Sequence, residues 1–257
     1  MEKIKPISTK DLELYKKSES GDSEEGLLMP LSKHLEDLRN KIIVSVFFVS
    51  ITTVIGFTLS KEIIRLLINI APNDTTFLQI KPGEFFFTTL RVALYFGIST
   101  ASPIIIWQLG NFILPGLKTQ EKKAIFPILI SSPILFFSGI LFSYFFVAPS
   151  MFKFLFNFGQ GIISTSISIE SFISFTLMIL SVCGFIFLIP VVFFALAIAG
   201  IITSATLLKK WRYAILGSFI AGAIFTPTPD PFNMGIVSGI LIALYFISVI
   251  ALKIARL

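Results

Sequence analysis

The chain has 257 residues, of which 54% are hydrophobic and 14% are charged, and its formal net charge is +6. Soluble globular domains average about 25% charged residues, so the composition indicates an integral membrane protein. The single cysteine, Cys183, excludes an internal disulfide and a thiolate metal cluster. We attribute the basic excess to the flanks of membrane spans and expect no nucleic-acid binding.

The first 29 residues are polar and include the run KKSESGDSEEG. A segment of this composition buries too little apolar surface to offset the entropy lost on folding. We therefore expect a disordered tail over residues 1–29, followed by a membrane domain over residues 30–257.

A short polar segment, LSKHLEDLRNK, precedes the first apolar run. Leu31, Leu35, Leu38 and Ile42 recur at helical spacing and form one apolar stripe. Ser32 is a possible N-cap. The pattern predicts a short amphipathic helix that lies in the membrane interface and turns its acids to water.

The charged residues of this segment allow two interpretations. Glu36 and Arg39 are spaced for an i,i+3 ion pair on a helix. Asp37 and Lys41 are spaced for an i,i+4 pair, and such pairs would make the segment an interfacial anchor. Alternatively, the acids receive a cationic ligand. His34 has no second candidate ligand near it in the sequence, so we expect no metal site there.

Candidate membrane spans follow along the chain. A helix needs about 20 predominantly apolar residues to cross a bilayer. The six candidates cover residues 42–59, 85–110, 124–149, 172–202, 213–226 and 234–252. The fifth is short for a bilayer core. Because no period-2 alternation is present, we predict an all-α membrane protein with six transmembrane helices.

Prolines occur inside these spans, at Pro103, Pro127, Pro133 and Pro190. A proline in a helix interior removes one backbone hydrogen bond and kinks the helix. Kinked, Phe-rich helices that curve together would form a concave cup rather than a straight bundle.

The basic residues that flank the spans indicate the orientation. One side collects Lys33, Arg39, Lys41, Lys118, Lys122, Lys123, Lys209, Lys210, Arg212, Lys253 and Arg256. The other side has Lys61, Arg65, Lys81 and Lys153. Lys and Arg are enriched in loops on the side of synthesis. We therefore place both termini on this cis side, which is the cytoplasm of a bacterium or the stroma of a plastid.

The cis segment NFILPGLKTQEKK, between the second and third spans, contains Glu121, the only acid on the cis side after Asp37. Glu121 is either a solvated loop charge among lysines or a second acid that acts with Asp37 in receiving a cationic ligand.

The trans turn TPTPDPFN, residues 226–233, combines three prolines with one acid. Pro227, Pro229 and Pro231 would stop the fifth helix and start the sixth. Asp230 would lie near the N-terminus of the sixth helix, where the helix dipole favours an anion. The alternative to a functional acid is a plain turn.

Four segments in order resemble the TatC family, the polytopic receptor subunit of the twin-arginine protein translocase. They are HLEDLR, FLQIKPGEFFFTTLRVAL, ASPIIIWQLGNFILPGLKTQEKK and TPTPDPFN. The resemblance runs from about Pro30 to Leu252 and is closest to the cyanobacterial and plastid branch. It implies a six-helix cup with short fifth and sixth spans.

The resemblance also implies site residues. The signal-peptide site would contain Glu36, Asp37, Arg39, Phe112, Pro115 and Glu121. The functional or structural residues of the trans side would be Glu84, Pro227 and Asp230.

Three positions depart from the family pattern. Asp37 stands where Glu is commoner, which keeps the charge on a shorter side chain. Leu188 stands where Glu or Gln is usual inside the fourth span, and Met234 stands where Gln is usual, with Asn233 beside it as a possible substitute. The last two departures put in doubt partner contacts that use those polar groups.

The resemblance implies the core subunit of a translocase, with no enzymatic activity and no cofactor. The protein would bind twin-arginine signal peptides of folded precursors and associate with itself in a receptor complex. It would scaffold single-span TatA- and TatB-type subunits for transport driven by the proton-motive force. Arginine pairs bidentately with carboxylates, so acids at the cis edge suit such a ligand.

The residues alone leave two other functions open, a secondary transporter or ion channel and a membrane assembly factor. A transporter would place paired ionisable groups at mid-depth, whereas only Arg91 is a plausible intramembrane charge. The content of 29 Phe and 2 Trp fits a plastid-encoded protein of the thylakoid membrane. A bacterial plasma membrane is the alternative.

Overall fold

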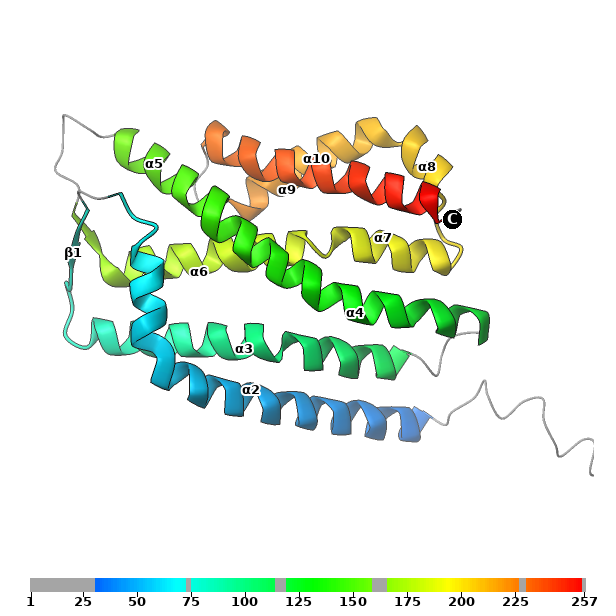
Figure 1. Ribbon diagram of the computed structural model, residues 1–257, viewed down its shortest axis with the longest axis horizontal. Coiled ribbons are helices and arrows are strands. Elements are labelled where there is room, and N and C mark those ends of the chain that lie inside the picture. The colour runs from blue at the N-terminus through cyan, green and yellow to red at the C-terminus, as the bar shows by residue number, and fades with distance from the viewer. Residues whose placement is uncertain (1–30, 73–74, 114–118, 159–165, 227–229, 256–257) are drawn as a thin grey trace, which may run out of the picture.

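The computed structural model describes residues 31–72, 75–113, 119–158, 166–226 and 230–255, and helices dominate it (Figure 1). Five helical stretches of this part of the chain are long and apolar enough to cross a membrane. They are His34–Ile68, Glu84–Phe112, Phe126–Phe158, Ile169–Ile198 and Pro231–Ile254, and the shorter apolar helix Trp211–Phe225 supplies a sixth span. The predicted all-α membrane fold is confirmed. The predicted tail over residues 1–29 lies outside the described residues.

The first helix, α2, runs without a break over Leu31–Ile68. The amphipathic segment that we expected as a separate interfacial helix is therefore the first part of the helix that spans the membrane. The physical reason is that no glycine or proline separates residues 31–41 from the apolar run that follows. The i→i−4 hydrogen-bond ladder continues where nothing interrupts it.

The second long helix, α3, covers Glu84–Ile113 and packs along α2 (Figure 1). Gly97 permits the close approach, because a Cβ at that position would lie 2.8 Å from the backbone nitrogen of Thr53. The hydroxyl of Thr52 donates a 2.9 Å hydrogen bond to the Gly97 carbonyl. Small residues at a contact between membrane helices allow such packing and interhelical hydrogen bonds.

The third span is longer than its predicted range, 124–149. It consists of α4 at Thr119–Phe142, the π-helical turn η2 at Ser143–Val147 and α5 at Ala148–Phe158. Pro127 and Pro133 lie inside α4. The π-turn absorbs one extra residue, which lets the helix continue to the trans surface instead of ending at Pro149.

The fourth span, predicted over 172–202 with a kink or a freed carbonyl at Pro190, extends over Ile169–Ile198 and is interrupted by a turn at residues 187–188. Helix α6 covers Ile169–Ile186 and α7 covers Ile189–Ile198. Pro190, in the first turn of α7, has no backbone N–H to donate, and its ring excludes the carbonyl four residues earlier. Gly200, with a φ of +69°, follows α7 in the left-handed conformation that commonly ends a helix.

The last helices are α8 at Ser204–Lys209, α9 at Trp211–Phe225 and α10 at Pro231–Ile254. Helix α9 is short, as expected for the fifth span. On the cis side, the hydroxyl of Tyr245 donates a 2.7 Å hydrogen bond to the Leu207 carbonyl, which ties α10 to α8.

Two strands of three residues each, not predicted from the sequence, join separate parts of the chain on the trans side. Strand β1, Thr76–Leu78, pairs in parallel with β2, Ser166–Ser168. The pairing brings the segment before α3 beside the segment before α6.

A smaller buried cluster around Leu207 and Tyr245 joins α7, α8 and α10 in the cis half. The larger buried core lies in the trans half, where α5 and α6 meet the ends of α2 and α3. Its buried side chains include Ile64, Leu67, Val92, Met151, Phe152, Phe172 and Ile173. The rings of Phe152 and Phe172 are stacked with centroids 4.5 Å apart. The N-terminal end of α2 and the C-terminal end of α10 lie at the opposite, cis end of the molecule (Figure 1), which agrees with the predicted placement of both termini.

Candidate functional site

The cis site begins with an aromatic stack between α2 and α3. The ring of His34, in the first turn of α2, lies on the ring of Phe112 near the end of α3, with centroids 4.3 Å apart and an interplanar angle of 20°. The Lys41 ammonium lies 5.8 Å from the centroid of the Phe112 ring, within the range of a cation–π contact. Sequence reasoning missed the role of His34 because its partner is on another helix.

The predicted ion pair between Asp37 and Lys41 forms, with Nζ 2.7 Å from a carboxylate oxygen. The Asp37 side chain is 37% exposed, whereas that of Lys41 is 17% exposed. Lys41 therefore links Asp37 to Phe112. Glu36 and Arg39 are both exposed, and they do not pair with each other in the described part of the chain. The structure thus brings together Asp37 and Phe112 but leaves the other two charges in solvent.

An apolar groove of about 210 Å³ continues from this cluster into the membrane. Leu38, Ile42 and Val46 line it from α2, and Ile105, Leu109 and Phe112 line it from α3. Lys41 and Gln108 also line the groove, so that polar groups border an apolar slot.

Of the two remaining predicted cis residues, Pro115 and Glu121, the structure describes only the backbone position of Glu121. Pro115 lies outside the described residues. Glu121 falls in the first turn of α4, which begins at Thr119, so its backbone is helical and not in a loop as predicted.

The trans site is centred on Glu84, the first residue of α3. Its side chain is buried and accepts hydrogen bonds from the backbone N–H groups of Ile80 at 2.7 Å and Lys81 at 3.0 Å. It also accepts from the Ser168 hydroxyl and from the backbone N–H of Glu170 at 3.2 Å. Glu84 therefore fastens the loop before α3 to the start of α6.

The turn that carries Glu84 depends on the glycine before it. Gly83 has a φ of +78°, in the left-handed region that residues with a Cβ seldom adopt. The KPGE sequence thus predicts a tight turn into a helix, although the four partners of the carboxylate were not predictable from it.

A second polar contact joins the same two helices. An Arg91 guanidinium nitrogen lies 3.1 Å from a Glu170 carboxylate oxygen, and Arg91 also donates to the Ser174 hydroxyl. The two charged side chains are 38% and 32% exposed. The sequence identified Arg91 as a charge within a span but missed its partner. The available signal was that Arg91 and Glu170, of opposite charge, both lie near the trans ends of their spans.

Asp230 is the N-cap residue of α10, as its position before Pro231 suggested. One carboxylate oxygen accepts from the backbone N–H of Asn233 at 2.7 Å, and the other accepts from the side-chain amide of Asn233 at 2.8 Å. Asn233 is fully buried. Pro227 lies outside the described residues. Among those that are described, no group of three or more His, Cys, Asp or Glu side chains is close enough to hold a metal ion.

The arrangement of these elements matches proteins of one family. Residues 33–239 match the family described as Sec-independent protein translocase protein (TatC).

The chain belongs to the TatC family.

Individual relatives agree. The chain is 38% identical over 218 residues to the chloroplastic Sec-independent protein translocase protein TATC of Oryza sativa subsp. japonica, covering 84% of this chain and 61% of that protein. It is 36% identical to the Sec-independent protein translocase protein TatC of Synechocystis, covering 85% of each. It is 41% identical to an uncharacterized tatC-like protein ycf43 of Gracilaria tenuistipitata var. liui, covering 88% of this chain and 94% of that protein.

Solved structures show the same fold. This chain superposes on a crystal structure of the twin-arginine translocase receptor TatC with a TM-score of 0.73 and 33% sequence identity. The superposition covers 87% of this chain and all of that one. The six-span cup is therefore the family fold. Members of this family are components of a protein transport system rather than enzymes, and this one is a multi-pass protein of a thylakoid or plasma membrane.

Within the TatC fold, Leu188 lies at the break between α6 and α7. Together with Ile106, Leu109, Leu129 and Val192, it lines a largely apolar cavity of about 480 Å³. Where the family resemblance leads one to expect Glu or Gln, this TatC family member therefore presents an apolar surface. Met234 is half-buried one residue after the fully buried Asn233.

Proposed function

We propose that this core subunit of the twin-arginine translocase binds the signal peptides of folded precursors at the cis end of α2 and α3. The observation that carries the proposal is the cluster of Asp37, Lys41 and Phe112 at the mouth of an apolar groove. A twin-arginine signal peptide combines two guanidinium groups with an apolar stretch, and the cluster offers a carboxylate beside an apolar surface.

In this proposal, an arginine of the signal peptide displaces Lys41 from the Asp37 carboxylate. Asp37 holds Lys41 through a single ammonium contact of 2.7 Å. An arginine can bind a carboxylate through two parallel N–H···O bonds, which an ammonium cannot do. An arriving guanidinium therefore replaces Lys41 on Asp37, and the released ammonium stays near Phe112. The apolar part of the signal peptide then enters the groove between α2 and α3.

Glu121 supplies the second carboxylate in this proposal. Its place in the first turn of α4 puts it at the cis end, where α3 and α4 are joined through residues 114–118. Arg39 and Glu36, which are exposed on α2, contribute to the charge around the site. We assign Pro115, which lies outside the described residues, to the same site.

The partner subunits belong to the same proposal. Single-span TatA- and TatB-type subunits dock on the membrane-facing surfaces, and copies of this chain associate in a receptor complex. The support is that the apolar helices leave large side chains exposed, as in Val54 of α2 and Ile224 of the short helix α9, which are 68% and 71% exposed. The proton-motive force supplies the energy for transport.

Crosslinking of a precursor to the full chain in membranes tests the signal-peptide site. We expect Asp37→Asn to reduce crosslinking of a twin-arginine precursor roughly tenfold or more, because it removes a charge-assisted pair. Glu62→Gln is the matched control, since Glu62 lies near the other end of the same helix and is exposed. A precursor with Lys-Lys in place of the two arginines should bind as weakly to wild type as the normal precursor binds to Asp37→Asn. Wild-type crosslinking by Asp37→Asn would overturn the proposed site.

A further inference from the structure

The third span is longer than the hydrocarbon core of a bilayer requires. The apolar stretch Phe126–Phe158 has 33 residues, which corresponds to roughly 50 Å of helix. The hydrocarbon core of a bilayer is about 30 Å thick. Figure 1 shows α4 and α5 running obliquely to the other long helices. Because the stretch is much longer than the hydrocarbon core, we place its last part, α5, in the trans headgroup region.

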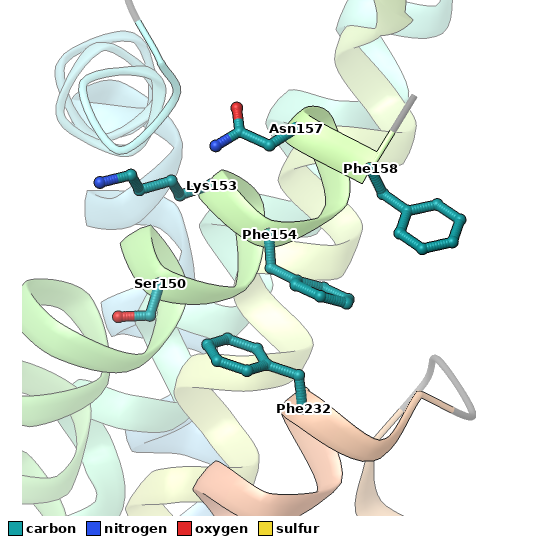
Figure 2. Close-up of a pocket in the computed structure, with 6 residues that line it drawn as sticks. All are labelled: Ser150, Lys153, Phe154, Asn157, Phe158 and Phe232. Carbon is teal, nitrogen blue, oxygen red and sulfur yellow. The ribbon is translucent and has the colours of Figure 1, made fainter. Parts of the chain in front are cut away.

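A pocket of about 520 Å³ opens there between α5 and the start of α10 (Figure 2). It is lined by Ser150, Lys153, Phe154, Asn157 and Phe158 of α5 and by Phe232 of α10. The α5 residues recur at helical spacing and therefore share one face of the helix. The volume falls in the range of pockets that hold small molecules, about 300 to 1,000 Å³.

The apolar side of the pocket is formed by its three rings. Phe154 and Phe232 are stacked with centroids 4.7 Å apart and an interplanar angle of 18°. Phe158 is 83% exposed. In the view of Figure 2, the polar tips of Ser150, Lys153 and Asn157 extend toward the opposite edge from Phe158.

The polar side of the pocket carries a positive charge without a counter-ion. Lys153 is exposed and forms no ion pair within the described part of the chain. Helix α5 contains no acid, and the nearby carboxylate of Asp230 is held by the first turn of α10 through its two bonds to Asn233. Asn157 adds an amide as a further donor, whereas the Ser150 hydroxyl donates a 2.7 Å hydrogen bond to the Phe146 carbonyl and offers only its oxygen as an acceptor.

We propose that this pocket binds an anionic lipid of the trans leaflet. The Lys153 ammonium pairs with the negatively charged headgroup, the Asn157 amide donates to its oxygens, and the acyl chains lie along the phenylalanine rings. The anionic headgroup matches the polar side of the pocket, and the acyl chains match its apolar side. A lipid also fits the position of the pocket at the trans surface of the membrane. Basic side chains at a membrane surface attract anionic lipids in this way. The proposal is independent of the signal-peptide site at the opposite surface.

The test uses the purified full chain in detergent, with native mass spectrometry as the measurement of retained lipid. Phosphatidylglycerol is the anionic probe and phosphatidylcholine, with the same acyl chains, is the neutral one. We expect wild type to retain phosphatidylglycerol in preference, and Lys153→Gln to lower that retention roughly tenfold, as loss of a charge-assisted contact predicts. Lys61→Gln, which removes an exposed lysine on the same side of the membrane, should retain it as wild type does.

Further arms separate the lipid from other occupants. Phe154→Leu should reduce retention of phosphatidylglycerol, because one face of the ring stack is lost. Inorganic phosphate added in excess should not displace the lipid, and full displacement would mean that the pocket is a site for free anions. Equal retention of the two lipids, or unchanged retention of phosphatidylglycerol by Lys153→Gln, would overturn the proposal.

Discussion

The cis and trans surfaces of this TatC family member are built in different ways. On the trans surface, Glu84 has four hydrogen-bond donors and Arg91 is paired with Glu170, in the same half of the molecule as the larger buried apolar core. On the cis surface, α2 contacts α3 through the stack of His34 on Phe112 and through Lys41 over the same ring, and within the described residues the carboxylate of Asp37 has a single lysine partner.

This difference suggests that the trans surface is a structural scaffold and that the cis surface is the receptor for the signal peptide. A polar group whose hydrogen bonds are all made within the protein contributes to stability and has little capacity left for a ligand. A carboxylate with one exposed and replaceable partner keeps that capacity. We therefore expect substitutions on the trans surface to change stability first, and substitutions on the cis surface to change signal-peptide binding first.

Glu84→Ala should have the largest effect, because it leaves the backbone N–H groups of Ile80, Lys81 and Glu170 without their acceptor. We expect the thermal midpoint of the purified protein to fall by roughly 5 °C or more. Glu62→Ala, which removes an exposed carboxylate paired with Arg65, should change the midpoint by less than about 2 °C. Equal effects of the two substitutions would break the distinction between the surfaces.

Arg91→Gln should destabilise the protein less than Glu84→Ala does. It leaves the half-exposed Glu170 carboxylate without its cation, and we expect the midpoint to fall by roughly 3 °C. The double variant with Glu170→Gln should recover part of the loss, because neither charge then remains unpaired. Additive losses would show that the 3.1 Å ion pair contributes no coupling.

Sequence reasoning recovered the spans because apolar length and flanking lysines depend on local composition. It placed a kink at Pro190 in the fourth span, but it did not predict the turn at residues 187–188, because a proline can either kink or end a helix and the packing around it decides which. It also missed the pairing of Arg91 with Glu170, which lie 79 residues apart and meet only when α3 packs on α6.

The same contrast holds for the candidate sites. The N-cap role of Asp230 is a local property, and a residue before Pro231 at a helix start could be assigned from the sequence. The stack of His34 on Phe112 and the bonds of Glu84 with Ser168 and Glu170 are tertiary contacts. A single sequence carries no signal for which distant side chains meet, so these contacts required the structure.

Asp230 tests whether the trans surface also has a role in transport. Asp230→Ala removes the helix cap and should lower the free energy of unfolding by about 1 kcal/mol. Asp230→Asn keeps one acceptor for the backbone N–H of Asn233 but sets its amide against the side-chain amide of Asn233. Its stability should therefore lie between those of wild type and the alanine variant.

Transport assays with both Asp230 variants sharpen this test. We expect Asp230→Asn to lose transport nearly as far as Asp230→Ala, because both remove the charge, while precursor crosslinking at the cis surface survives. Normal transport by Asp230→Asn would limit the role of Asp230 to capping, and normal transport by both would make TPTPDPFN an ordinary turn.

The smallest predicted effect concerns Lys41 and has the opposite sign. Lys41 occupies the Asp37 carboxylate at 2.7 Å and must leave it when an arginine of the signal peptide arrives. Lys41→Gln removes this competitor, so we expect binding of the twin-arginine precursor to tighten roughly two- to fivefold, the range that a partly exposed ion pair supports. Stability should change little, because Phe112 keeps its stack with His34.

Titration of a labelled signal peptide against the purified variant measures the effect, with Lys61→Gln as the control at the far end of α2. Weaker binding by Lys41→Gln would mean that the ammonium contacts the signal peptide itself, and the cis surface would then recognise its ligand through Lys41 as well as Asp37.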